Sequence, residues 1–151
     1  MKTKLLLLTT FAVCGLALQG CDDDDNISVG KDVEVAFLQK YPDATGVSWE
    51  RKSTYLVADF WRNDMQARAE AWFDGSAVWY VTETDVRFEA LPQAVKDGFA
   101  VSEYASWRVE DVDMLERKGM ETVYVIEVEL GNQEYDLFYS ADGTLVKAVV
   151  D

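Results

Sequence analysis

The sequence has 151 residues, of which 49% are hydrophobic and 28% charged, a composition typical of one or two small globular domains. Acidic residues outnumber basic residues by 28 to 14, which argues against nucleic acid as a partner because binding it needs a basic surface. The chain has no histidine, so Ser-His-Asp catalysis, His-ligated zinc or haem, and an imidazole pH switch are excluded.

The first twenty residues have the pattern of an export signal. Two lysines precede an uncharged apolar run at residues 5–18, which is too short to span a bilayer as a stable anchor. The run ends in Leu18-Gln19-Gly20-Cys21, which resembles the lipobox of bacterial lipoproteins. The resemblance implies that residues 1–20 are a lipoprotein signal peptide and that Cys21 carries lipid chains that anchor the protein to a membrane.

A block of aspartates follows Cys21. Like charges in such a block stay solvated and extended, so residues 21–30 are predicted to form an acidic tether. The block also resembles the acidic export tag of some Gram-negative surface lipoproteins, which implies the outer face of the outer membrane; its members are Asp22, Asp23, Asp24 and Asp25. A calcium loop is disfavoured because the glycine turn and closing glutamate are missing. The other cysteine, Cys14, leaves with the signal, so no disulfide is expected.

Past the tether, the sequence predicts two copies of one unit, at residues 31–86 and 87–151. Each copy begins with a short amphipathic helix, one stopped at Tyr41-Pro42 and one with Pro92 in its first turn. The apolar helix positions are Val33, Phe37 and Leu38 in the first copy and Leu91, Val95 and Phe99 in the second.

Strand-like segments follow each predicted helix and match one another at a constant offset. Their hairpin signals are Asn63-Asp64, Asp74-Gly75, Gly131-Asn132 and Asp142-Gly143. A single unit of this length would be marginal alone, whereas two packed units would fold better. The predicted fold class is therefore α+β, with two tandem repeats that each consist of a helix followed by a four-stranded antiparallel β-meander.

This pattern resembles the PepSY-like, β-lactamase-inhibitor-protein-like domains of exported bacterial lipoproteins. The resemblance rests on residues 37–49 (FLQKYPDATGVSW), on the Asp-Gly hairpins and on the predicted duplication. It implies a binding or inhibitory module and not a catalyst. The second copy departs from the pattern, since it reads Tyr104-Ala105 where the first copy has Tyr41-Pro42.

Alternation along the strands predicts which side chains face the core. In the second copy the predicted core positions are Tyr124, Ile126, Val128, Leu130, Tyr135, Leu137 and Tyr139. The equivalent positions of the first copy are Leu56, Ala58, Phe60, Ala67, Ala69, Ala71, Val78 and Tyr80. The alanines among them would leave room for the helix that carries Phe37.

The opposite face of the first copy is predicted to be aromatic, and we interpret it as a partner-binding surface. Pairing about Asn63-Asp64 would place Tyr55 opposite Trp72 and Asp59 opposite Arg68. Trp, Tyr and Arg supply most interface hot spots, and few monomers leave so apolar a face in water. The alternative is that the second copy covers this face or that it only shields the sheet. The predicted binding residues are Tyr55, Trp61, Arg68, Trp72 and Trp79.

The same face of the second copy is predicted to be acidic. Pairing about the turn at residues 131–132 places Glu127 opposite Asp136 and Glu129 opposite Glu134, and like charges placed opposite each other destabilise a sheet. A basic partner or a bound divalent cation such as Ca²⁺ would compensate them. The alternative is that the side chains splay into solvent, where salt screens the repulsion.

The function predicted from these patterns is non-enzymatic and needs no cofactor, because open strands in small units offer no water-excluding cleft for a pair of catalytic carboxylates. We expect an exported, outer-membrane, surface-exposed lipoprotein whose sheet binds a protein or peptide, with inhibition as one form of that binding. Its acidic charge favours basic partners. Two alternatives remain open: a carbohydrate-binding accessory protein that stacks sugars on Trp72 and Trp79, and an envelope structural protein that self-associates through the aromatic face.

Overall fold

The computed structural model describes residues 27–150. The expected signal peptide, the lipidation site Cys21 and the aspartate block at 22–25 lie outside the described residues. The elements in chain order are α1 (Lys31–Lys40), β1 (Thr45–Lys52), β2 (Tyr55–Arg62), β3 (Ala67–Phe73), β4 (Trp79–Asp85), the 3-10 helix η1 (Phe88–Ala90), α2 (Gln93–Ala100), β5 (Arg108–Arg117), β6 (Val123–Leu130), β7 (Gln133–Ser140) and β8 (Leu145–Val150).

The strands form one eight-stranded antiparallel sheet in which neighbours along the chain are neighbours in space, from β1 to β8. The prediction of two tandem repeats, each with its own four-stranded meander, is wrong. β4 and β5 pair continuously from Val81 opposite Arg117 to Asp85 opposite Asp113, so the sheet runs through the expected boundary. Turn signals predict hairpins within a meander, but they do not reveal whether its last strand stays an edge or pairs onward.

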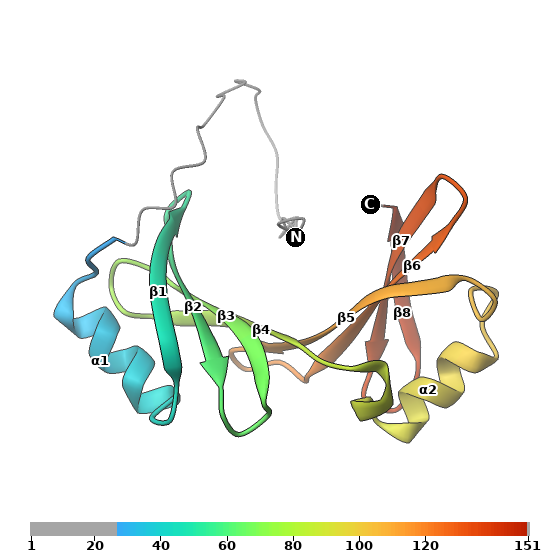
Figure 1. The fold of residues 1–151 in the computed structure, drawn as a ribbon, viewed down its shortest axis with the longest axis horizontal. Helices are drawn as coiled ribbons and strands as arrows, with labels where there is room; N and C mark the ends of the chain where they lie inside the picture. The colour runs from blue at the N-terminus through green and yellow to red at the C-terminus, as the bar shows by residue number, and fades with distance from the viewer. Residues whose placement is uncertain (1–26, 151) are drawn as a thin grey trace.

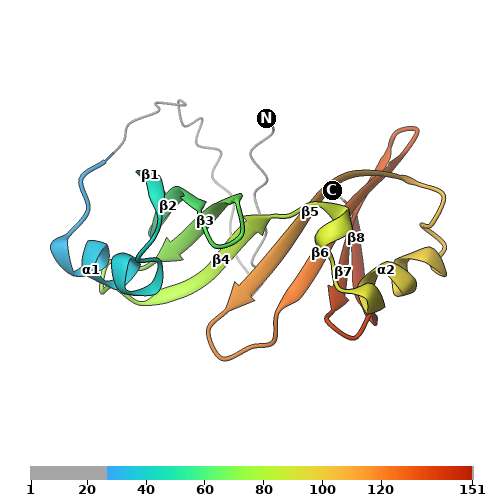
Figure 2. The same ribbon diagram turned by 60° about the horizontal axis from the view of Figure 1, so that its bottom comes forward.

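The sheet is curved, and α1 and α2 lie near its two ends on the same, outer side (Figure 1). Figure 2 shows the two helices from a second direction, again separated by the middle strands. We call the side packed against the helices the covered face and the opposite side the open face. Within residues 27–150, neither α-helix combines the length and apolar character that crossing a bilayer requires.

One part of the covered face packs under α1. Val33 and Phe37 of α1 are buried, and the Phe37 ring meets Phe60 edge to face at 4.9 Å and Trp49 at 5.4 Å. The predicted small core positions are confirmed, since the alanines at 58, 69 and 71 are buried in the same cluster. The expectation for Leu38 is wrong, because it is 46% exposed. The residues that pack into the core are spaced four apart, at Val33, Phe37 and Tyr41.

A second cluster on the covered face packs under α2. The predicted helix positions Leu91, Val95 and Phe99 are buried there, together with the predicted strand positions Ile126, Val128, Leu137 and Tyr139. The helix lies close to the turn between β7 and β8, because a side chain at Gly98 would overlap the backbone carbonyl of Gly143. Leu130 was expected in this core but is exposed, since it is the last residue of β6.

Candidate functional site: the open face of the sheet

An apolar group occupies the middle of the open face. Leu115, Val125 and Phe138 form a buried cluster there, with Val123 packed against it. Nearer to β1, Val57 is fully buried between strands, opposite Trp72. Neighbouring side chains therefore close over parts of this face, although α1 and α2 lie on the other side of the sheet. The sequence analysis did not identify this cluster, because Leu115 joins the paired residues Val125 and Phe138 only through the pairing of β5 with β6.

Four of the five predicted binding residues lie on the open face, as two pairs near opposite ends of the β2–β3 hairpin. The rings of Tyr55 and Trp72 meet edge to face at 5.8 Å. Trp61 is 38% exposed and lies opposite Arg68, which pairs with Asp59 at 2.6 Å. These contacts place an aromatic side chain, a cation and a carboxylate within reach of one partner surface.

The expected register of β2 and β3 is wrong, although the expected contacts form. Val57 lies opposite Trp72, and Asp59 lies opposite Glu70. The turn was expected at Asn63-Asp64, but the loop spans residues 63–66, and Gln66 has a positive φ of 52° with its side-chain amide donating to Asn63 O. Tyr55 and Arg68 still reach their expected partners because diagonal neighbours on one face are in range of long side chains.

Trp79 was expected on the open face, and the structure places it on the covered side. Its indole N–H donates to Thr82 Oγ1 at 2.9 Å, and Lys40 of α1 lies 3.6 Å from its ring centroid. The register shifts between Trp72 and Phe73, which pair with Val81 and Trp79, so alternation is broken at Tyr80. The β3–β4 loop includes Ala77 at a φ of +64°, a conformation that a simple Asp-Gly signal does not predict.

Tyr80 takes the place on the open face that was expected for Trp79. It is 43% exposed, its ring lies 5.4 Å from that of Tyr55, and its hydroxyl donates to Asp74 at 3.3 Å. We call Tyr55, Trp72 and Tyr80 the aromatic cluster. Three rings held edge to face form a rigid apolar surface, the property that makes aromatic residues effective at protein interfaces.

A groove of about 430 Å³ lies beside the aromatic cluster, where the β3–β4 and β5–β6 hairpins approach each other. The β3–β4 side of the lining includes Trp72, Tyr80 and Val81, and Trp79 also reaches it although its ring packs on the covered side. Arg117, Lys118 and Met120 supply the β5–β6 side. The backbone N–H of Lys118 donates to Tyr80 O at 3.2 Å, which ties the two hairpins together at this point. The groove thus combines residues from both sides of the β4–β5 junction that the sequence analysis did not expect.

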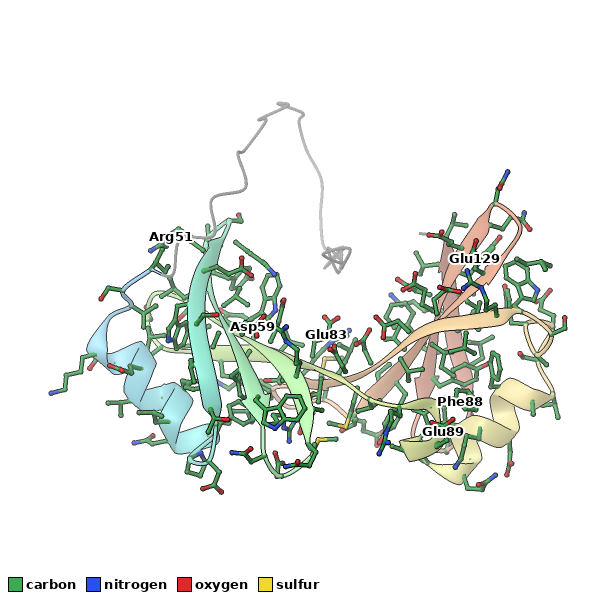
Figure 3. The ribbon with its side chains drawn as sticks, viewed as in Figure 1. Arg51, Asp59, Glu83, Phe88, Glu89 and Glu129 are labelled. Atoms are coloured by element: carbon green, nitrogen blue, oxygen red, sulfur yellow. The ribbon has the colours of Figure 1, made fainter. Side chains whose placement is uncertain are left out.

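Carboxylates surround these apolar groups. Figure 3 shows Asp59 and Glu83 on the side of the sheet away from the helices, directed into the space that the sheet curves around. Register places Glu70 between them, directly opposite both. Further along the sheet, the open face carries Asp85, Asp111, Asp113, Glu127, Asp136, Glu129 and Glu134.

The carboxylates are most crowded near the β4–β5 junction. Burial raises the pKa of the Asp85 carboxyl, and the neighbouring Asp111 carboxylate raises it further, while Arg68 acts in the opposite direction. Asp113, opposite Asp85, is also buried. Placing a cation over this part of the face would relieve repulsion between like charges that have lost part of their hydration.

The acidic pairs expected on β6 and β7 occur as predicted, with Glu127 opposite Asp136 and Glu129 opposite Glu134. Arg108 forms ion pairs with both Glu129 and Glu110, so the chain itself supplies part of the compensation. Among the described residues, no group of three or more acidic side chains is arranged to hold a metal ion.

Comparison with known proteins assigns the family. The family model described as "Putative beta-lactamase-inhibitor-like, PepSY-like" matches residues 53–147. The chain belongs to this family. The resemblance to this family is thereby confirmed over a range that includes the Asp-Gly hairpins, whereas residues 37–49 lie outside the match and the duplication on which it also rested is wrong. The inhibitor-like description agrees with a non-enzymatic binding module.

Solved structures agree with the PepSY-like assignment. A BLIP-like protein from Bacteroides fragilis has 35% identity and a TM-score of 0.78, covering 82% of this chain and 87% of that chain. A DUF2874 family protein from Bacteroides ovatus has 31% identity and a TM-score of 0.77, covering 82% and 89%. A protein from Bacteroides eggerthii, described among "putative periplasmic proteins", has 26% identity and a TM-score of 0.74, covering 82% and 89%. No curated protein matches the chain.

Proposed function

We propose that this PepSY-like protein is an exported, non-enzymatic module that captures another protein through the open face of its sheet. The observation that carries the proposal is the aromatic cluster of Tyr55, Trp72 and Tyr80 beside a groove of about 430 Å³, on the face turned away from both helices. Rigid aromatic groups next to a concave apolar site are the usual anchors of protein interfaces. Family membership supports a binding role, and inhibition of the captured protein is the form that the family description suggests.

Charge supports a basic partner. The whole chain carries a net charge of −14, and Asp59, Glu70 and Glu83 lie side by side across the open face. Such a surface speeds the approach of basic proteins and disfavours acidic ones. The capture rate is therefore expected to fall as salt rises. The carbohydrate-binding and self-association alternatives gain no support from the comparisons.

Affinity capture from the envelope of the native host tests the proposal. The tagged full chain is compared with Trp72→Ala and Tyr80→Ala variants, and Leu38→Ala serves as the control because Leu38 is exposed on α1, away from the open face. We expect one basic protein that the wild type and the control retain and that both open-face variants lose, with one-to-one binding after repurification. Equal retention by all four proteins would contradict the proposal.

Anchoring by lipid at Cys21 is a second part of the proposal. It is supported by the Leu18-Gln19-Gly20-Cys21 pattern, and the similar Bacteroides eggerthii protein described among "putative periplasmic proteins" supports export alone. Metabolic labelling with an alkyne fatty acid is expected to mark the wild type and not Cys21→Ser. Labelling of the serine variant would contradict lipidation at Cys21.

Replacing Asp22, Asp23, Asp24 and Asp25 with Asn is expected to keep the protein from the cell surface, so that an external protease no longer cleaves it.

A further inference from the structure

We infer that the groove beside Trp72 is the anchoring point of the open face, and that it takes one aromatic side chain from a partner loop in which basic residues flank that side chain. The inference rests on the proposed function, because it identifies what part of the partner the open face recognises. It goes further in assigning the groove, the side-chain type and the charge of its neighbours.

The size of the groove favours a single side chain. Its volume of about 430 Å³ lies at the lower end of the range of small-molecule pockets, roughly 300–1,000 Å³. A volume of this size accommodates one aromatic ring carried on a protruding loop. The backbone bond from Lys118 to Tyr80 holds the hairpins at this separation.

The walls of the groove favour an aromatic ring. Trp72 is fixed by its edge-to-face contact with Tyr55, which in turn meets Tyr80, so the rings are already ordered before a partner arrives. Preordered walls lower the entropy that binding loses. On the other side Met120 is 64% exposed, and its flexible thioether can close over an inserted ring.

The charges around the groove favour basic neighbours for that ring. Glu83 lines the groove, and Asp85 is the next residue of β4 on the same face. Glu70, opposite Glu83 on β3, already pairs with Lys52 at 2.9 Å. Arg117 and Lys118 lie on the other wall, over β5 and the hairpin that follows it. The basic residues of a partner loop are therefore expected over β4, beside Glu83 and Asp85 and away from Arg117 and Lys118.

Short peptides and a groove-filling variant test the inference with the full chain in detergent. The probes are acetyl-Gly-Lys-Phe-Lys-Gly-amide, the same peptide with Ala for Phe, and the same peptide with Glu for both lysines, and binding is followed by NMR or tryptophan fluorescence. Met120→Trp is the test variant because it places an indole at the mouth of the groove. Val101→Trp is the matched control, since Val101 is 88% exposed and lies beyond the end of α2.

We expect the Phe peptide to bind about tenfold more tightly than either other peptide, the scale of an anchor residue losing its pocket. Met120→Trp is expected to abolish that preference and to weaken the binding of the captured partner about tenfold, while Val101→Trp changes neither. If capture depends on Trp72 but Met120→Trp leaves it unchanged, and the three peptides bind equally, the groove inference fails and the proposed function stands. If neither Trp72→Ala nor Met120→Trp affects capture, both fail. Preferential binding of a soluble oligosaccharide in the groove would also overturn the inference.

Discussion

The two faces of the sheet use aromatic residues in different ways. On the covered face, Phe37 of α1 lies edge to face against Trp49 and Phe60, and all three rings are buried. On the open face, Tyr55, Trp72 and Tyr80 make the same kind of edge contact with one another, but the helices lie on the other side of the sheet. Whether an aromatic residue on a strand belongs to the core or to a docking surface can therefore be decided only when it is known which face of the sheet the helices cover.

The comparison predicts that large truncations cost far more stability on the covered face. Phe37→Ala is expected to lower the free energy of unfolding by about 3–5 kcal/mol, because it leaves a cavity among rings that cannot collapse into it. Trp61→Ala removes a larger side chain from the open face and is expected to cost less than about 1 kcal/mol, since Trp61 already meets water. Urea unfolding of the two full-chain variants checks this. Equal losses would show that the open face is a core rather than a docking surface.

The sequence predicts the covered face well where strands stay in register. The buried positions Ile126 and Leu137 follow simple alternation, and Glu127 opposite Asp136 follows the turn at residues 131–132. Trp79 and Tyr80 could not be assigned, because the bulge at Tyr80 moves Trp79 to the covered face and Tyr80 to the open face, while Val81 and Glu83 keep the open-face positions that simple alternation gives them.

The sequence predicts the part of the candidate site that comes from one hairpin, but not the part that depends on pairing between β4 and β5. Tyr55 and Trp72 come from a hairpin, whose pairing the sequence limits to a few registers. The groove also needs Arg117 and Met120, which reach Trp72 only because β4 pairs with β5. Pairing between the last strand of one meander and the first strand of the next leaves no turn signal, so neither the continuous sheet nor the groove could be inferred.

Titration of Tyr41 sharpens the comparison, because this phenol belongs to the covered face. It shares a hydrogen bond of 2.6 Å with Thr82 Oγ1, and burial, with a smaller effect of Glu116, raises the pKa of Tyr41 to about 12 from an ordinary value of 10.0. The folded state therefore holds this proton more tightly than the unfolded state. The resulting stability is fully present below pH 10 and is lost as pH rises towards 12.

The loss attributable to Tyr41 between pH 10 and 12 is expected to be about 2–3 kcal/mol. Urea unfolding of the wild type and of Tyr41→Phe across that range measures it, since the phenylalanine variant lacks this proton and other groups cancel in the difference. Absorbance at 295 nm reports when the phenolate forms. If the unfolding free energies of the two proteins changed in parallel with pH, the pKa of Tyr41 would be the same in the folded and unfolded states.

Helix α2 offers a test of how closely the covered face is packed. A methyl group at Gly98 would overlap the carbonyl oxygen of Gly143 in the β7–β8 turn, whereas Gly30 has open space around it. Gly98→Ala gains helix propensity, but it must push the helix away from the turn, and we expect a net loss of about 1–3 kcal/mol. Gly30→Ala is the control and is expected to change the melting temperature little. A stabilised Gly98→Ala protein would show that α2 is only loosely attached.

The smallest effect is expected from the ion pair on the open face. Arg68 and Asp59 lie 2.6 Å apart, but both side chains are partly in water, which weakens their attraction and leaves it open to screening by salt. A double-mutant cycle with Arg68→Gln and Asp59→Asn is expected to give a coupling of about 0.2–1 kcal/mol that disappears in concentrated NaCl. A larger coupling that survives salt would mean that this pair is shielded from water and helps to hold β2 and β3 together. In that case Arg68 could leave Asp59 to bind a partner only with a loss of folding stability. A weak pair instead allows both side chains to bind a partner with little loss of stability.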